Sequence, residues 1–235
     1  SRGLGDVYKR QGTDSKITTV GYYCNPIQYA EHRKTLENVI CTAGKFGATH
    51  VSTFAGAWEG KPVESAYEEF GKVFRELADL AEEKGVKLGI ENCLMDGTWE
   101  HATCNIGFNP KAWEVMFEEV KNDNFGLEWE PTHQMVQLID PVTELRKWCK
   151  KIVHIHGKDA TIDWDAVRHS GISGAVPFVW HRMPGFGDTN WRDIISILRS
   201  NGYEDDICIE GYHDPVYSGE LEMTGPVSYT HLTLP

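Results

Sequence analysis

The chain has 235 residues, 40% of them hydrophobic, and a formal net charge of −12 at pH 7. No apolar run approaches the roughly 20 residues that a membrane-spanning helix needs, so we expect no membrane partner. The acidic balance repels phosphate groups and excludes nucleic acid as a partner.

The two ends of the chain resemble translated sequencing-adapter read-through, as found on metagenomic open reading frames. These segments are Ser1–Gln11 and Pro226–Pro235, and we expect them to be non-native. Residues 12–225 show no linker or low-complexity tract, which predicts a single domain. The six scattered cysteines form no C-x-x-C pair, which favours a reduced, cytoplasmic protein over a disulfide framework.

Short β-rich runs alternate with amphipathic helices along this domain. Helices are expected around Leu36–Ala43, Tyr67–Ala81, Trp113–Val120, Leu145–Trp148 and Trp191–Leu198. Asn109-Pro110 and Asp140-Pro141 are each typical of a helix start, and Gly85 of a helix end. Residues 160–175 are expected to be irregular. The expected strands are Ile17–Tyr23, Ala48–Ala55, Val86–Asn92, Phe125–Glu130, Lys151–Asp159, Val176–Arg182 and Asp206–Glu210.

Strands and helices that alternate with short connections predict a parallel sheet with right-handed crossovers. The G-x-G-x-x-G turn of a dinucleotide-binding fold is missing after the early strands, and Gly185-Phe186-Gly187 is only a weak substitute. A (β/α)₈ barrel has about 250 residues. We therefore predict a (β/α)₈ TIM barrel that is truncated at its N-terminus and lacks the first βα unit.

Polar side chains recur on the inner face of four expected strands, near the ends where barrel enzymes carry their catalytic groups. In the strand Lys151–Asp159, alternation places Val153 and Ile155 toward the helices and Ile152 on the inner face with the two histidines. The inward polar residues of the four strands are Glu91, Glu128, Glu130, His154, His156, Cys208 and Glu210.

Several carboxylates buried at one barrel mouth imply a bound cation, because an unpaired buried charge is very costly. Any one of these glutamates alone would more often be a salt-bridge partner or cap, and a histidine pair alone would as often be a hydrogen-bonded core pair. Agreement across four strands favours the metal site. Carboxylates with one imidazole favour Mn²⁺, Mg²⁺ or Co²⁺, and Zn²⁺ is compatible.

Five ordered motifs carry a resemblance to a known family. The chain resembles the xylose isomerase-like TIM-barrel superfamily, and within it the sugar phosphate isomerase/epimerase group related to D-tagatose 3-epimerase. The match runs from about Ile17 to Gly225. The motifs are I-E-N at 90–92, W-E-P-T-H at 129–133, H-I-H-G-K-D at 154–159, P-G-F-G-D-T-N-W at 184–191 and C-I-E at 208–210.

The resemblance implies a role for individual residues. The metal ligands would be Glu91, Glu130, His156 and Glu210, and His133 would contact the substrate and assist catalysis. Glu130 stands where the family usually has aspartate, and Glu128 could compete for the ion. Further substrate contacts are expected from Lys158 and Arg182, with His181 a weaker candidate.

The chemistry that the resemblance implies is proton transfer at a carbon beside a carbonyl, through a metal-stabilised enediolate, with Glu91 and Glu210 as the proton carriers. The first expectation is an isomerase or epimerase of a carbohydrate or sugar phosphate. A lyase or dehydratase acting on a keto sugar is the main alternative. An endonuclease IV-like phosphodiesterase and a non-catalytic sugar-binding barrel rank lower, and a homo-oligomer is compatible with the sequence.

Overall fold

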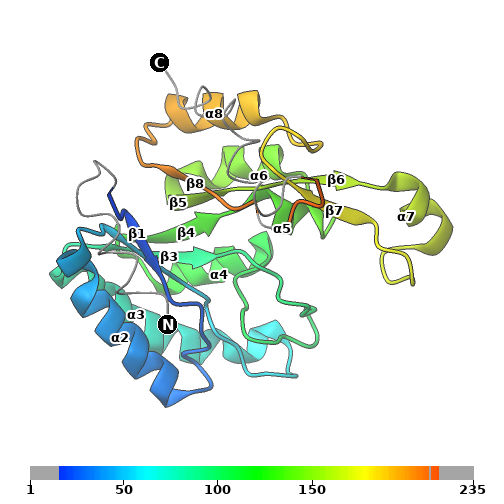
Figure 1. Ribbon diagram of the computed structural model, residues 1–235. Helices are drawn as coiled ribbons and strands as arrows, with labels where there is room; N and C mark the ends of the chain where they lie inside the picture. The colour runs from blue at the N-terminus through cyan, green and yellow to red at the C-terminus, as the bar shows by residue number, and fades with distance from the viewer. Residues whose placement is uncertain (1–15, 212, 217–235) are drawn as a thin grey trace.

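The computed structural model describes residues 16–211 and 213–216, and the predicted non-native segments Ser1–Gln11 and Pro226–Pro235 lie outside these ranges. The fold is a TIM barrel, and its main sheet has six strands that all pair in parallel (Figure 1). In spatial order these are β1 (Thr19–Gly21), β2 (His50–Thr53), β3 (Lys87–Glu91), β4 (Phe125–Trp129), β5 (Ile152–Gly157) and β8 (Ile207–Ile209).

The helices that cover the sheet follow the predicted apolar stripes. The side chains of Asn109 and Asp140 accept hydrogen bonds from backbone N–H groups in the first turns of their helices, which confirms both as N-caps. Gly85 has a φ of 69° just after its helix, a conformation that glycine adopts without strain. The principal helices are α2 (Ala30–Ala43), α3 (Tyr67–Glu83), α4 (Pro110–Glu119), α6 (Pro141–Trp148) and α8 (Trp191–Ser200).

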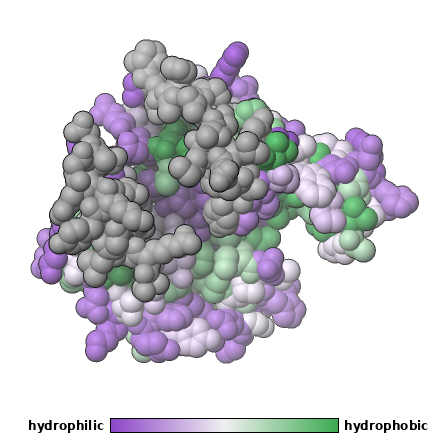
Figure 2. Space-filling model, in the orientation of Figure 1, coloured by the Kyte–Doolittle hydropathy of each residue, from purple (hydrophilic) through white to green (hydrophobic). Residues whose placement is uncertain are grey.

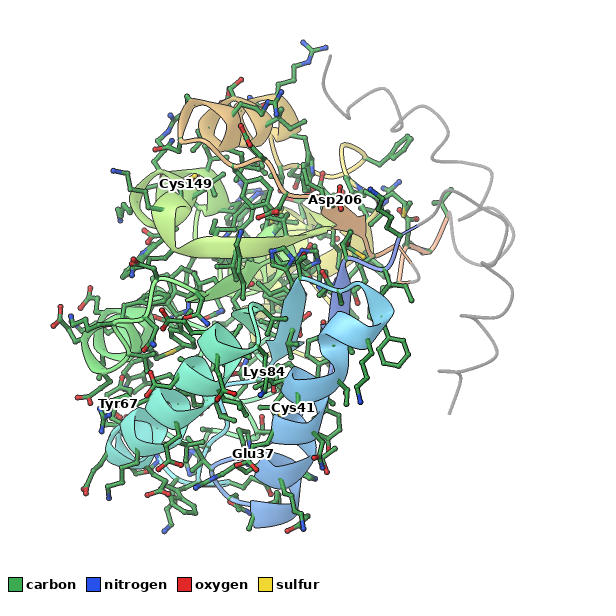
Figure 3. The ribbon with its side chains drawn as sticks, turned by 90° about the vertical axis from the view of Figure 1, so that its left-hand side faces the viewer. Glu37, Cys41, Tyr67, Lys84, Cys149 and Asp206 are labelled. Carbon is green, nitrogen blue, oxygen red and sulfur yellow. The ribbon has the colours of Figure 1, made fainter. Side chains whose placement is uncertain are left out.

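The core lies between this layer of helices and the outer face of the sheet. Figure 3 shows α2, labelled at Glu37 and Cys41, beside α3, labelled at Tyr67 with Lys84 just past its last residue. Phe70 stacks on Phe74 with ring centroids 4.6 Å apart, and both are fully buried. Burying each such ring stabilises the fold by roughly 1.5–3 kcal/mol. Within the described residues, no helix is long and apolar enough to cross a membrane.

The expected sixth strand, Val176–Arg182, does not join the main sheet. Its C-terminal part forms β7 (Val179–Arg182), which pairs antiparallel with β6 (Asp159–Ile162) in a separate two-stranded sheet. The stretch predicted to be irregular holds β6 and a short helix, α7 (Trp164–Ser170). Within α7 only Ala166 is buried. This helix therefore has no apolar stripe that could pack against the sheet, as the helix of a parallel βαβ crossover does.

Because of a β-bulge between β4 and β5, two side chains of β5 lie on the faces opposite to those predicted. The register between β4 and β5 shifts at Leu127/Glu128, so Ile152 pairs with Leu127 whereas His154 pairs with Glu128. Ile152 therefore packs in the hydrophobic core, and the methyl groups of Val153 fill the space that glycines leave on β3 and β4. Simple alternation assigned these two residues to the opposite faces, because it cannot anticipate an extra residue in the strand.

Candidate metal centre

Four neighbouring strands bring the four proposed ligands to one end of the sheet. Glu91 is the last residue of β3, Glu130 follows β4, His156 lies in β5 and Glu210 follows β8. Each offers a ligand atom, and these atoms all lie within 4.8 Å of one another. The strands run parallel, so their carboxyl ends meet at the same edge, which is where sequence alternation predicted a site.

An asparagine that the sequence analysis gave no role ties two of these strand ends together. Asn92 donates its side-chain amide to the carbonyl of Glu130 (2.9 Å) and accepts a hydrogen bond from the Glu130 N–H (2.7 Å). Pro131 then begins the short helix α5 (Pro131–Met135). The backbone of Glu130 is therefore fixed on both sides. The sequence signal available for Asn92 was its place directly after the inward-facing Glu91, as the last residue of I-E-N.

The His156 imidazole lies at the centre of the cluster. Its Nδ1 is 3.0 Å from Glu91 Oε1, 3.4 Å from Glu210 Oε2 and 3.7 Å from Glu130 Oε2. Lys158 is 3% exposed, and its Nζ lies 3.5 Å from Glu130 Oε1 and 3.3 Å from Glu210 Oε2. One nitrogen of the imidazole thus faces three carboxylates, with a buried ammonium beside two of them.

Several carboxylate oxygens of the cluster are buried without a hydrogen-bond partner among the described residues, and they fit a divalent cation. Both oxygens of Glu130 and Oε2 of Glu210 are in this state. Burial raises the pKa of Glu91 to about 7, opposed by its hydrogen bond from His156, and burial together with Glu130 raises the pKa of Glu210. A cation would satisfy the unpaired oxygens and favour the ionised carboxylates, and this oxygen-rich set with one imidazole suits Mg²⁺, Mn²⁺ or Co²⁺ and accommodates Zn²⁺.

Glu130 also contacts His133, the histidine predicted to face the substrate. His133 Nε2 lies 3.3 Å from Glu130 Oε1. Burial raises the pKa of Glu130, but His133, His156 and Lys158 together outweigh burial and hold this pKa well below the usual glutamate value. Burial lowers the pKa of His133, with Glu130 opposing. Glu130 is therefore held in its ionised form beside His133, His156 and Lys158.

Glu128 lies on the other side of the His156 ring. Its Oε1 is 3.2 Å from His156 Nε2 and accepts a hydrogen bond from Ser52 Oγ (2.6 Å). Its Oε2 accepts a hydrogen bond from Tyr23 Oη (2.8 Å). Burial lowers the pKa of His156, but Glu128, Glu130 and Glu91 outweigh burial and hold this pKa above the usual histidine value. A cation in the cluster would displace the proton on Nδ1, and the contact with Glu128 would keep the proton on Nε2.

Sequence reasoning missed both hydroxyl partners of Glu128. The inward register of the β2 segment H-V-S-T could have identified Ser52, because Val51 points to the core. Tyr23 follows β1 and gave no comparable signal.

His154 behaves as a core histidine, the ordinary alternative left open for this strand. Its ring lies 5.9 Å from the His156 ring and 5.7 Å from the His50 ring, and Thr19 Oγ1 is 3.3 Å from its Nε2. Burial lowers the pKa of His154 to about 4, opposed by Glu128, so the ring is neutral at physiological pH. His154 and His156 also form a group with Cys208 whose ligand atoms lie within 4.8 Å, without the carboxylates of the main cluster.

Two further basic residues lie near the mouth of the site. Arg182 Nε is 3.2 Å from the buried Asp214 Oδ2, so this predicted substrate contact already has an acidic partner. The His181 ring lies 5.3 Å from the His213 ring, and its buried Nδ1 has no hydrogen-bond partner among the described residues. Burial and the nearby Lys158 lower the pKa of His181 to about 4.

The carboxylate of Asp159 joins two of the sequence motifs. It accepts hydrogen bonds from the backbone N–H groups of residues 160, 185, 187 and 189, and from the indole N–H of Trp191 (3.1 Å). A Cβ on Gly187 would lie only 2.5 Å from Asp159 Oδ1. The glycines of P-G-F-G-D-T-N-W therefore let the backbone wrap around a carboxylate of the same chain, and they do not form a dinucleotide-binding turn.

The chain matches one protein family over most of its length. The model of the xylose isomerase-like TIM barrel family matches residues 11–225. An inosose dehydratase of Clostridium tetani is 26% identical over 170 residues, which are 70% of this chain and 54% of the relative. The chain thus spans about half the length of the curated relatives it matches.

Solved structures share the fold at low sequence identity. A xylose isomerase domain protein from Planctomyces limnophilus has a TM-score of 0.73 and 17% identity, with 97% of this chain and 80% of that chain covered. The IOLI protein with a bound zinc atom has a TM-score of 0.69 and 20% identity, with 97% and 81% covered. At these identities the similarity concerns the barrel architecture.

Proposed function

Because the chain belongs to the xylose isomerase-like TIM barrel family, we propose that it provides the active site of a metal-dependent dehydratase. The substrate would be a keto sugar or a cyclic polyol that carries a ketone. The observation that carries this proposal is the largely buried cluster of Glu91, Glu130, His156 and Glu210, with three carboxylate oxygens that find no hydrogen-bond partner within the described part of the chain. Relatives named as inosose dehydratases support this reaction over the isomerase or epimerase that the sequence motifs first suggested, and one relative is named as an inosose isomerase.

The four clustered residues would hold one divalent cation. When bound, such a cation would polarise a substrate carbonyl and an adjacent hydroxyl, and would offset the negative charge that develops when a neighbouring proton leaves. Glu128 holds the His156 ring from the other side, which keeps Nδ1 directed at the cluster.

Glu91 and Glu210 are the proposed proton carriers. They come from separate strands and reach His156 Nδ1 from distances of 3.0 and 3.4 Å. One carboxylate would take the proton from the carbon beside the carbonyl, so the C–H electron pair moves into the new C=C bond. The C–O bond of the β-hydroxyl then breaks, and that hydroxyl leaves as water with a proton from the enzyme.

Lys158 and His133 are the proposed orienting groups. Lys158 Nζ lies beside Glu130 and Glu210 and would donate a hydrogen bond to a substrate oxygen bound at the cluster. His133, next to Glu130, would donate to a hydroxyl of the substrate. Because both residues are largely buried, each such hydrogen bond would form away from bulk water, where it is stronger.

An isomerase or epimerase remains the second candidate, and one observation favours it. Two carboxylates on different strands, Glu91 and Glu210, can remove a proton from one position and return it at another. Both reactions begin with the same proton abstraction, so they differ only in whether a leaving group departs. A phosphodiesterase is disfavoured, because the net charge of −12 opposes an approach by nucleic acid.

The proposal is tested by incubating the protein, loaded with Mn²⁺, Co²⁺ or Mg²⁺, with an inosose and with a panel of ketoses in D₂O. We expect metal-dependent deuterium uptake beside the carbonyl and loss of water from the product, detected by mass spectrometry. A labelled product of unchanged formula would instead establish the isomerase or epimerase.

Variants then test the residues. Glu91→Gln or Glu210→Gln should lower turnover by roughly 10²-fold to 10⁴-fold, the usual contribution of a positioned acid or base. The exposed Glu83→Gln on α3 is the matched control and should leave turnover unchanged. Metal-dependent cleavage of a phosphodiester, with no exchange on any ketone, would overturn the proposal.

A further inference from the structure

A cysteine lies beside the candidate metal centre without a role in the proposed reaction. Cys93 is two residues beyond Glu91, at the start of the connection between β3 and α4 (Figure 1). A ligand atom of Cys93 lies within 4.8 Å of one from Glu91 and of one from His133, and those two atoms also lie within that distance of each other. The three side chains therefore bring a sulfur, an oxygen and a nitrogen close together.

Glu91 and His133 each contact the carboxylate cluster through a single atom. The Oε1 atom of Glu91 is 3.0 Å from His156 Nδ1, and its Oε2 atom makes no hydrogen bond or ion pair with a described residue. The Nε2 atom of His133 is 3.3 Å from Glu130 Oε1, and within the described ranges its Nδ1 atom has no such contact. Both side chains are largely buried. Each therefore keeps a second donor atom with which to bind an ion.

These three donors suit a different class of cation from the carboxylate cluster. Thiolate sulfur favours soft ions such as Zn²⁺, whereas carboxylate oxygens favour Mg²⁺ and Mn²⁺. In a tetrahedral zinc site, metal–ligand distances of about 2.0–2.3 Å place the ligand atoms roughly 3.3–3.6 Å apart. Because no pair of these atoms is more than 4.8 Å apart, side-chain shifts of roughly 1–1.5 Å are enough to reach this spacing. Three protein ligands leave the fourth position open for water or a substrate oxygen.

We propose that Glu91, Cys93 and His133 form a second cation site, which binds a thiophilic divalent ion such as Zn²⁺ beside the carboxylate cluster. Glu91 belongs to both sites and would bridge the two ions through its two oxygens. Binding at the second site replaces the S–H bond of Cys93 by a metal–sulfur bond and releases the proton to solvent. The site is defined by its ligands, so it does not depend on which reaction the cluster catalyses.

The other roles open to Cys93 fit the structure less well. Cys93 is not part of the described hydrophobic core, although the next residue, Leu94, packs against that core, so a packing role does not account for the thiol. Burial and Glu91 raise the pKa of Cys93 to about 12. A thiol that keeps its proton is a poor nucleophile and a poor redox sensor. A bound cation, by contrast, stabilises the thiolate directly.

Titration of the metal-free protein with Co²⁺, a spectroscopic substitute for Zn²⁺, tests this proposal. A Co²⁺–thiolate bond gives a near-ultraviolet charge-transfer band that oxygen and nitrogen ligands do not give. The chain carries 35 acidic residues, and Figure 2 shows hydrophilic surface (purple) over much of one face, so a count of bound ions alone would include weak surface binding. We expect two tightly bound equivalents of Co²⁺ in equilibrium dialysis, together with the thiolate band.

Variants assign the band to its ligands. Cys93→Ser should lose the band and one equivalent of Co²⁺. Cys104→Ser is the matched control, because Cys104 is a half-buried cysteine of the same connection, and it should keep both. Glu130→Gln should lose the ion of the carboxylate cluster and keep the band. Circular dichroism verifies that each variant is folded.

A wild-type protein that binds a single equivalent, or that shows no band, would overturn the proposal, as would a band that survives in Cys93→Ser. Loss of the band in a folded Glu130→Gln would place Cys93 in the carboxylate cluster and would also refute a separate site. Deuterium uptake beside a substrate carbonyl without the band would refute this site alone, whereas the band without uptake would refute the proposed reaction alone.

Discussion

The two glutamates of E-W-E should differ in their effect on metal binding. Replacing Glu130 by Gln removes a proposed ligand whose two oxygens are buried and lack hydrogen-bond partners in the residues that the structure describes, so stoichiometric metal should be lost from the cluster. Replacing Glu128 by Gln leaves the four clustered residues in place and alters only the group that faces His156 Nε2. The metal should still bind, but more weakly.

The size of the Glu128 effect follows from the contact it makes. Glu128 Oε1 lies 3.2 Å from His156 Nε2, and a hydrogen bond to a charged group contributes about 1.5–3 kcal/mol. Loss of that contribution corresponds to a decrease in metal affinity of roughly 10-fold to 100-fold, the usual effect of removing a group that orients a metal-binding histidine. Tyr23→Phe and Ser52→Ala each remove one hydrogen bond to Glu128 and should have smaller effects of the same sign.

The assay is competitive titration of Mn²⁺ or Co²⁺ against a chelator, combined with metal analysis of the purified protein. Glu83→Gln, an exposed glutamate on α3, is the control for the loss of one negative charge. In the metal-loaded protein, ¹⁵N NMR of the His156 ring should report a proton on Nε2 only in the wild type and a redistributed tautomer in Glu128→Gln. Retained stoichiometric metal in Glu130→Gln, together with loss of metal in Glu128→Gln, would show that the two roles are reversed.

Three further predictions concern stability. Gly126→Ala should destabilise the fold by about 1–3 kcal/mol in urea denaturation, because the new Cβ would lie 2.3 Å from the carbonyl oxygen of Lys151 beside the bulge. Asp159→Asn should lower the free energy of unfolding by at least about 3 kcal/mol, because an amide NH₂ would face N–H donors on one side and leave them unpaired. Burial raises the pKa of Asp205, but its hydrogen bond to Lys87 (2.6 Å) outweighs burial and holds that pKa below its usual value. The ionised Asp205 therefore stabilises the protein above about pH 4, and the stability difference between wild type and Asp205→Asn should disappear as the pH falls through the folded-state pKa.

Matched control variants separate these mechanisms from a general sensitivity of the fold to substitution of glycine or aspartate. Gly44→Ala meets no atom within 4 Å and has an ordinary φ of −62°, so it should be neutral or stabilising by about 0.4–1 kcal/mol. Asp165→Asn changes a side chain that is 96% exposed and should be nearly silent. Equal effects of Gly126→Ala and Gly44→Ala would refute the packing argument at the bulge, and a pH-independent effect of Asp205→Asn would refute the ion-pair argument.

The sequence by itself determined the order of the six parallel strands and of the principal helices, and the end of the sheet at which the candidate site lies. Both follow from local rules: the spacing of apolar residues sets the type of element, and parallel strands carry their carboxyl ends to the same edge. Asn109 and Asp140 were recognised as helix caps because capping depends on residues only a few positions apart. Glu91, His156 and Glu210 followed from the same alternation, since each lies at or near the end of an inward-facing strand.

Only the tertiary structure decided which inward-facing residues meet. Alternation predicts which face of a strand a residue occupies, but not how far along the strand it lies relative to residues of the neighbouring strands. Glu91 pairs laterally with Glu128, whereas the carboxylate of β4 that joins the cluster of Glu91 belongs to the next inward residue, Glu130. The bulge that reorients Val153 depends on the packing of β4 against β5. Likewise β7 was expected in the main sheet and β6 was expected to be irregular, and only the tertiary structure shows that the two strands pair with each other in a separate sheet. In each case the physical reason is the same: contacts between segments distant in sequence select among arrangements that are locally equivalent.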